Sequence, residues 1–114
     1  MDMQIDQLTA GEAVVLVPHG RLDSNTSATL EKPLMAAIEG GAKKLVIDFD
    51  NLAYLSSAGL RVLLMGLKKS KAAGAKLALA GLKPNLQEVF AVSGFANLFT
   101  IAADRKAALA AIGA

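Results

Sequence analysis

Residues 45–69, LVIDFDNLAYLSSAGLRVLLMGLKK, constrain the fold more than any other part of the chain. An apolar stretch typical of a buried strand is followed by a short loop and by a helix that begins at two serines. Four leucines of this helix recur at i, i+3, i+4 and i+7 and must face a sheet: Leu60, Leu63, Leu64 and Leu67. Ser57 is expected at the positive end of the helix, where backbone N–H groups point outward and an added phosphate would be tolerated. The segment favours a switch over a catalyst.

The rest of the chain alternates strand-like and helix-like segments without a linker or a low-complexity tract. Strands are predicted over residues 3–8, 12–18, 44–49, 75–80 and 98–101. Helices are predicted after the candidate N-caps at 23–26 and over residues 57–73, 85–92 and 104–112. The order β-β-α-β-α-β-α-β-α predicts an α/β fold, with a mixed sheet of about five strands flanked by about four helices and an antiparallel pair at the N-terminus.

Composition favours a compact protein with a single core. Its 114 residues are 54% hydrophobic and 4% aromatic, so one domain over residues 1–114 is expected. Cysteine is absent, which excludes disulfides and cysteine zinc sites, and neither a metal nor a cofactor is predicted. The acidic N-terminal sequence and the lack of an apolar run of roughly 18 residues predict a cytoplasmic protein without direct membrane insertion. The net charge of +2 comes from interspersed acids and bases, which argues against nucleic-acid binding.

The serine pair at the start of the central helix has a purely structural interpretation. Serines at helix starts are commonest as N-caps, where the hydroxyl accepts a hydrogen bond from a backbone N–H two or three residues later. Ser56 or Ser57 could do only that.

The side of the helix opposite the leucines is also open to two interpretations. It carries Ala58, Val62 and Met65, where a surface helix is normally polar. Together with Ser57 and Arg61 these residues could form the middle of a small protein-binding patch. Alternatively, Val62 and Met65 are isolated exposed apolar residues, which are normal on protein surfaces.

The surroundings of Ser57 do not favour an enzyme. The hydrolase nucleophile motif G-x-S-x-G lacks its first glycine here, because residue 55 is leucine. The single histidine, His19, precedes the serine and is expected to be a strand-end residue with a hydrogen-bond partner. Phosphate-loop and dinucleotide-binding motifs do not occur. A non-enzymatic protein is predicted.

Three segments of the chain match one family pattern in order and spacing. They are GRLDSNTS at residues 20–27, DFDNLAYLSSAGLRVLL at residues 48–64 and VSGFANLF at residues 92–99. Together they resemble the STAS domain (sulphate transporter and anti-sigma factor antagonist), in which a strand ends in an acidic, apolar loop before a Leu-rich helix. The resemblance covers nearly the whole chain. It implies a mixed sheet flanked by helices, in agreement with the predicted element order.

The resemblance implies a binding module that is controlled by phosphorylation. In stand-alone bacterial members, the unmodified protein binds an anti-sigma factor that is also a serine kinase and so frees a sigma factor. Phosphorylation of the signature serine ends this binding, and a phosphoserine phosphatase resets it. Aligned on Gly59 and Leu60, the acceptor falls at Ser57. Ser56 stands where many members carry aspartate and is the alternative acceptor.

The resemblance and the helix-face patch together give the predicted partner-binding residues: Asp23, Ser24, Ser56, Ser57, Ala58, Arg61, Val62 and Met65. Asp23 matches the acidic residue that lies beside the acceptor in the family. A second function within the same fold is an accessory subunit of a membrane transporter or of a multi-protein signalling assembly, without a sigma-factor role.

Overall fold

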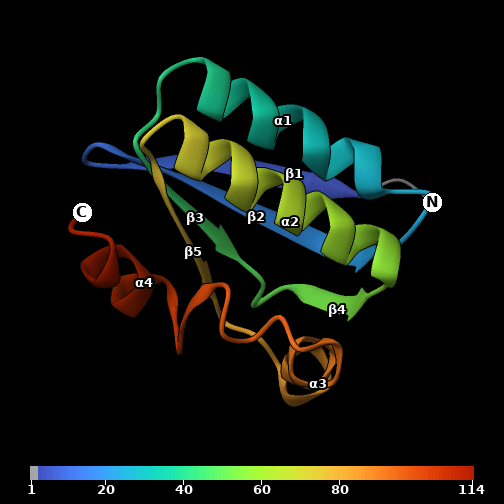
Figure 1. Ribbon diagram of the computed structural model, residues 1–114. Coiled ribbons are helices and arrows are strands. Elements are labelled where there is room, and N and C mark those ends of the chain that lie inside the picture. Colours follow the sequence, from blue (N-terminus) through green and yellow to red (C-terminus); the bar gives the residue numbers. More distant parts are fainter. Residues whose placement is uncertain (1–2) are drawn as a thin grey trace.

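The computed structural model describes residues 3–114 and confirms the α/β class (Figure 1). The elements follow one another as β1 (Gln4–Ala10), β2 (Ala13–Leu22), α1 (Ser27–Glu39), β3 (Lys44–Asp48), β4 (Leu52–Leu55), α2 (Ser57–Ala72), β5 (Lys76–Ala80), α3 (Pro84–Ser93), β6 (Thr100–Ala102) and α4 (Arg105–Ala111). Residues 1 and 2, which the expected domain includes, lie outside the described part.

The strands form one mixed sheet in the order β1-β2-β3-β5-β6. β1 pairs antiparallel with β2, whereas β2, β3, β5 and β6 are parallel to one another, as the helical crossovers require. The long strand β2 has two parallel neighbours on the same side. Its first half pairs with β3, and beyond an irregularity at Gly20 its last residues pair with β4.

β4 is the element that the sequence prediction missed, so the sheet has six strands instead of about five. The sequence predicts a short loop here. In the structure the segment has four residues and its burial does not alternate: Leu52 and Leu55 are buried, while Ala53 and Tyr54 between them are exposed. Pairing with the end of β2 makes it a strand. β4 brings the chain directly to the first residue of α2.

The sheet is covered on both faces (Figure 1). α1 and α2 lie side by side on one face, and their apolar residues join those of α3 in the larger core cluster. α4 packs on the other face against a smaller cluster. Along β2, Leu16 belongs to the first cluster and Val15 and Val17 to the second. The apolar run of β2 therefore belongs to a strand that is buried on both sides.

Candidate functional site

The carboxyl ends of β2 and β4 bring two loops together. Leu22 is the register partner of Leu55, and the N–H of Ser56 donates to the carbonyl of Leu22 over 2.9 Å. Asp23 and Ser24 follow Leu22 directly, whereas Ser57 follows Ser56 as the first residue of α2. The start of the β2–α1 loop therefore lies beside the start of α2. The four residues Asp23, Ser24, Ser56 and Ser57 form what we call the serine end of the sheet.

The two serines at the start of α2 have different roles. Ser56 is the N-cap: its backbone is extended and its Oγ accepts from the N–H of Gly59 over 3.3 Å. Ser57 is exposed, and none of the residues that the structure describes makes a hydrogen bond with its hydroxyl. The structural interpretation of the pair therefore holds for Ser56, and the hydroxyl of Ser57 is left at the surface.

Asp23 shapes the loop beside the serines. Its Oδ1 accepts from the N–H of Asn25 over 2.9 Å, while its own N–H donates to Thr26 Oγ1 over 2.9 Å. Its Oδ2 lies 3.9 Å from Nε of Arg21. The Asp23 side chain is 26% exposed, and Ser24 is exposed. Asp23 thus holds the turn before α1 with one carboxylate oxygen and leaves the other near solvent.

Gly59 allows α2 to start this close to the strands. A Cβ at this position would lie 2.7 Å from Leu22 Cγ and 2.8 Å from Leu55 Cδ1, which is closer than non-bonded carbon atoms approach. A larger residue would push the first turn of α2 away from β2 and β4. The glycine two residues after Ser57 is therefore needed by the packing that positions the serine.

The prediction of an apolar binding patch on the side of α2 opposite the leucines is wrong for Val62. Its side chain is 3% exposed and belongs to the larger core cluster, so it cannot contact a partner. The cause is α1, which packs against α2 on this side; a Cβ at Gly66 would lie 2.6 Å from Leu34 Cδ2. Ala58 and Met65 are half-buried at the edge of this contact.

The exposed face of α2 that adjoins Ser57 carries cations. Arg61 follows Ser57 by one helical turn and is exposed, as is Lys68 two turns further on. Ser57, Arg61 and Lys68 therefore share one exposed face of the helix, beside the leucine stripe.

A hollow of about 500 Å³ lies next to Ser57, and sequence reasoning missed it. Its walls come from β4, the first turn of α2 and one face of α3, and we call it the α2–α3 groove. It is defined by Tyr54, Ser57, Leu60, Glu88, Val89 and Val92. The sequence signal was the i, i+3, i+4, i+7 spacing of Asn85, Glu88, Val89 and Val92, which places these residues on one face of a helix.

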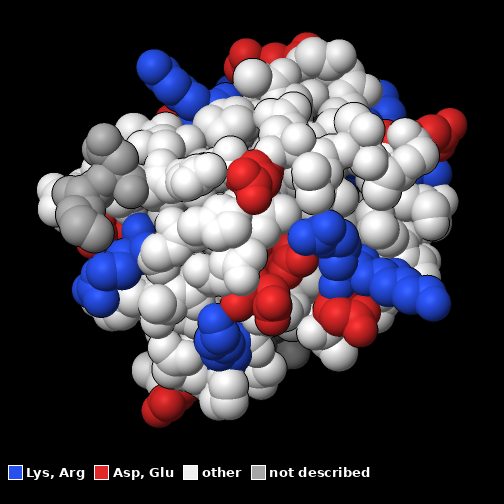
Figure 2. All heavy atoms as spheres, turned by 180° about the vertical axis from the view of Figure 1, so that it is seen from behind, with Lys and Arg blue, Asp and Glu red and all other residues white. Residues whose placement is uncertain are grey.

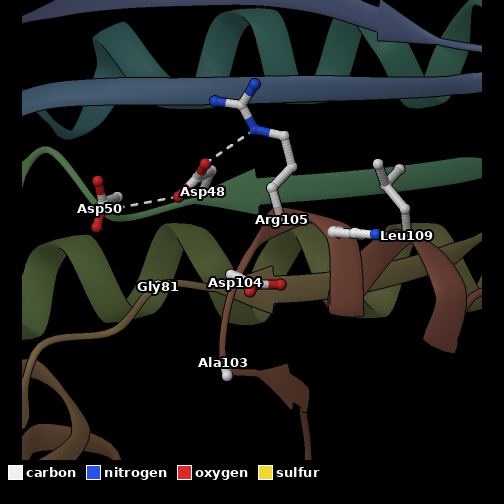
Figure 3. A pocket seen from close by; sticks show the side chains of 8 residues that line it. Asp48, Asp50, Gly81, Ala103, Asp104, Arg105 and Leu109 are labelled. Atoms are coloured by element: carbon white, nitrogen blue, oxygen red, sulfur yellow. Dashed lines mark hydrogen bonds and ion pairs between the residues drawn. The ribbon is translucent and has the colours of Figure 1, made fainter.

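A second hollow, of about 540 Å³, lies where β3 and β5 end and α4 begins (Figure 3). Asp48 is buried there. Its Oδ2 lies 2.9 Å from Nε of Arg105, and its Oδ1 accepts from the N–H of Asp50 over 3.0 Å. We call Asp48, Asp50, Gly81, Asp104 and Arg105 the aspartate end of the sheet. Both oxygens of its buried carboxylate already have partners.

Charges on the surface are mixed. Seen from behind, Lys and Arg side chains lie among Asp and Glu side chains, with uncharged surface around them (Figure 2).

Among residues 3–114, no group of three or more His, Cys, Asp and Glu side chains is placed to hold a metal ion. None of the helices within that range is both long enough and apolar enough to span a bilayer. His19 has the expected hydrogen-bond partner, because its Nε2 lies 2.8 Å from Oδ2 of Asp6. It lies within β2 and not at a strand end, because β2 continues to Leu22.

Comparisons with known proteins point to one family. The chain is 41% identical over 92 residues to BtrV of Bordetella bronchiseptica, named as an anti-sigma factor antagonist, and the match covers 81% of this chain and 79% of BtrV. An anti-sigma factor antagonist from Mycobacterium paratuberculosis superposes with a TM-score of 0.89 at 21% identity, covering 96% and 93% of the two chains. SpoIIAA superposes in its unphosphorylated form with a TM-score of 0.78 at 23% identity, covering 98% and 97%. Bacillus SpoIIAA in its phosphorylated form superposes with a TM-score of 0.70 at 24% identity, covering 92% and 95% of the two chains.

The family model of the STAS domain matches residues 4–108, which include every strand and most of the helix α4. The match contains both loops of the serine end and all three segments whose resemblance was noted in the sequence. The chain belongs to the STAS domain family.

Proposed function

We propose that this protein is an anti-sigma factor antagonist whose binding is switched off by phosphorylation of Ser57. In its unphosphorylated form it binds an anti-sigma factor with serine kinase activity and so releases a sigma factor. The observation that carries the proposal is the free, exposed hydroxyl of Ser57 at the first residue of α2, beside the Asp23 loop. The names of its relatives support the same role.

A phosphate on Ser57 fits the folded protein. It adds about −1.5 to −2 charges at neutral pH and would sit at the N-terminus of α2, where backbone N–H groups and the positive end of the helix dipole favour an anion. Arg61, one turn further on, supplies a cation on the same exposed face. The domain therefore stays folded when Ser57 is modified.

The same phosphate is unfavourable at a protein interface. A partner that covers Ser57 would have to desolvate the new charge without a group prepared for it, which costs several kcal/mol. Because about 1.4 kcal/mol corresponds to a tenfold change in Kd, binding weakens by roughly a thousandfold. Repulsion and desolvation end the complex without a large change of shape.

The proposed partner surface surrounds the serine end. It comprises Asp23, Ser24, Ser57, Ala58, Arg61 and Met65, while Ser56 contributes mainly by capping α2. Val62 is excluded because it is buried. The further components are a phosphoserine phosphatase that resets the switch and a cytoplasmic location, with residues 1–114 acting as one STAS domain. The fold alone does not separate this role from that of an accessory subunit of a transporter or signalling assembly.

The test uses the serine kinases of the anti-sigma factor class that the source genome encodes, purified one at a time and mixed with the chain and Mg-ATP. Trypsin releases residues 45–61 as one peptide with both serines, and fragmentation mass spectrometry assigns the phosphate. We expect modification at Ser57, tight binding of Ser57→Ala and binding of Ser57→Asp that is weaker by a large factor. Equal affinity of the two variants, or no kinase that modifies the chain, contradicts the proposal and favours the accessory role.

A further inference from the structure

The α2–α3 groove beside Ser57 is open and has exposed apolar side chains on two of its walls. Val92 is 81% exposed, the highest value among the large hydrophobic residues that are exposed, and Tyr54 on the opposite wall is 40% exposed. Scattered apolar residues on a surface are ordinary, but these two share one hollow with the half-buried Val89. An apolar hollow of this kind, next to a modifiable group, fits a side chain from another protein.

α3 is held rigidly enough to present this wall. Leu86 and Phe90 turn into the core, and the ring of Phe90 meets that of Phe99 edge-on with centroids 5.4 Å apart. At the start of the helix, Asn85 Nδ2 donates to the carbonyl of Ala53 over 3.2 Å, which ties α3 to β4. The exposure of Val92 is therefore a property of a packed helix.

One charge within the groove indicates what kind of partner it takes. Glu88 is the single charged side chain among the residues that line the hollow, and it is exposed. It forms no ion pair with any of residues 3–114. Glu88 also borders the hollow on the other side of α3, so it lies at the rim of the groove. A protein surface that covers the groove removes part of the water around this carboxylate, which favours a cation beside the apolar side chain.

We infer that the α2–α3 groove is the docking site through which the anti-sigma factor kinase recognises this chain. The kinase presents an apolar side chain that packs on Val92 and Tyr54, flanked by a lysine or arginine that meets Glu88. This inference rests on the proposed function, because Ser57 forms part of the groove wall. A kinase that reaches Ser57 covers about 800 Å² in a standard interface, far more than one serine, and the groove is the hollow directly beside it.

The decisive variant is Val92→Glu, and Ala91→Glu is its matched control. Both add the same charge to the last turns of α3, but Ala91 lines the hollow on the other side of the helix, toward β6. We expect Val92→Glu to raise the Kd for the kinase about tenfold or more, as loss of an interface anchor does, while Ala91→Glu stays close to the wild type. Melting temperatures of both variants should match that of the wild type, since both residues are exposed.

Glu88→Gln tests the charge. It should weaken binding and make the association rate less dependent on salt. The reason is that the ion pair between Glu88 and the lysine or arginine of the kinase, which speeds association of the two proteins, is lost. Binding of Glu88→Gln that is tighter than wild type, or a Val92→Glu variant that binds like Ala91→Glu, overturns the docking site.

The failure of this inference is distinguishable from failure of the proposed function. If Ser57→Asp weakens binding while Val92→Glu does not, the phosphorylation switch stands and the groove does not dock the kinase. If neither variant differs from the wild type, or no kinase binds, both proposals fail. Sedimentation of the chain alone tests whether a second copy of the chain occupies the groove instead. A dimer that Val92→Glu converts to a monomer would assign the groove to that second copy and overturn the inference.

Discussion

The serine end and the aspartate end occupy equivalent places in the fold and differ in how completely their polar groups are paired. Each lies at the carboxyl ends of parallel strands, β2 and β4 in one case and β3 and β5 in the other, where open α/β sheets commonly bind ligands. At the aspartate end, Asp48 uses both oxygens, and the carbonyl of Asp50 accepts from Lys83 Nζ over 2.7 Å. At the serine end, the Ser57 hydroxyl is exposed and unpaired within residues 3–114.

This difference shows where a change of charge can act on a partner. The aspartate end holds more ionisable groups, but the buried carboxylate of Asp48 is already paired with Arg105 and accepts a hydrogen bond from the backbone of Asp50. A modification can act with little internal cost only where a group is not already part of the packing, as at Ser57. Changes at the aspartate end should therefore alter stability, whereas changes at the serine end should alter binding.

The largest effect on stability is expected from Arg105→Ala. The change removes the ionic partner of Asp48, whose side chain is 8% exposed, and leaves its carboxylate buried without a counter-charge. Arg105 itself is 40% exposed, so water lowers the cost toward the lower end of the range for buried pairs, about 3 kcal/mol of the free energy of unfolding. Urea denaturation measures this, and binding to the kinase should be unchanged.

Lys106→Ala is the control for Arg105→Ala. Lys106 lines the same hollow and is exposed, so its removal should leave the free energy of unfolding within about 0.5 kcal/mol of wild type. If Arg105→Ala is no more destabilising than Lys106→Ala, the aspartate end is not a stabilising contact and the contrast between the two ends fails.

Val62→Ala is expected to have the second largest effect on stability. It should lower the free energy of unfolding by about 2 kcal/mol, because it removes two methyl groups from a side chain in the larger core cluster. Met65→Ala, one turn away and half-buried, should cost less. Thermal and urea unfolding measure both. Kinase affinity that falls with Val62→Ala while stability is preserved would return Val62 to the partner surface and contradict its burial.

Val62 illustrates what a helical pattern can and cannot predict. The leucine stripe correctly identified Leu60, Leu63 and Leu67 as buried, because a sheet covers one face of α2. Its fourth member, Leu64, is only half-buried at the edge of the larger core cluster. The pattern carries no information about a second helix. α1 covers the adjacent face, and this contact depends on Gly66, whose missing side chain leaves room for Leu34. Periodicity thus predicted the sheet contact but not the helix contact.

The serine end was predicted more completely than the groove beside it. Motif resemblance located Asp23, Ser56 and Ser57, and the order of strands and helices located them at one edge, since parallel strands end together. The groove depends on how α3 is oriented toward β4, and the pairing of β4 with β2 was itself not visible in so short a segment. Exposure of Val92 is a tertiary property, and the helix prediction over 85–92 gave no means to find it.

Gly59→Ala should affect both stability and the serine end. Its Cβ would meet Leu22 and Leu55, and the repacking costs more than the gain of about 1 kcal/mol from replacing glycine within a helix. We expect the free energy of unfolding to fall by about 1–2 kcal/mol. We also expect slower phosphorylation of Ser57, because the first turn of α2 is displaced. Urea unfolding and the rate of phosphate incorporation measure the two effects.

Gly66→Ala is the comparison for Gly59→Ala. Its Cβ would meet the terminal methyl of a single side chain, Leu34, far from the serines along the helix. Its stability loss should be smaller and its phosphorylation rate that of the wild type. If the two glycine variants are phosphorylated equally fast, the close approach at Gly59 does not position Ser57.

Ser56→Ala should have the smallest effect, about 1 kcal/mol, because it removes the N-cap hydrogen bond to Gly59 and nothing else. Ser56→Asp should restore the loss, since aspartate caps as well as serine does and favours the positive end of the helix dipole. The melting temperature of the three proteins measures the effect. Phosphate incorporated into Ser56→Ala should equal that of wild type, because the capping hydroxyl is engaged while that of Ser57 is free; a substantial loss of incorporation would make Ser56 an acceptor and remove the distinction between the two serines.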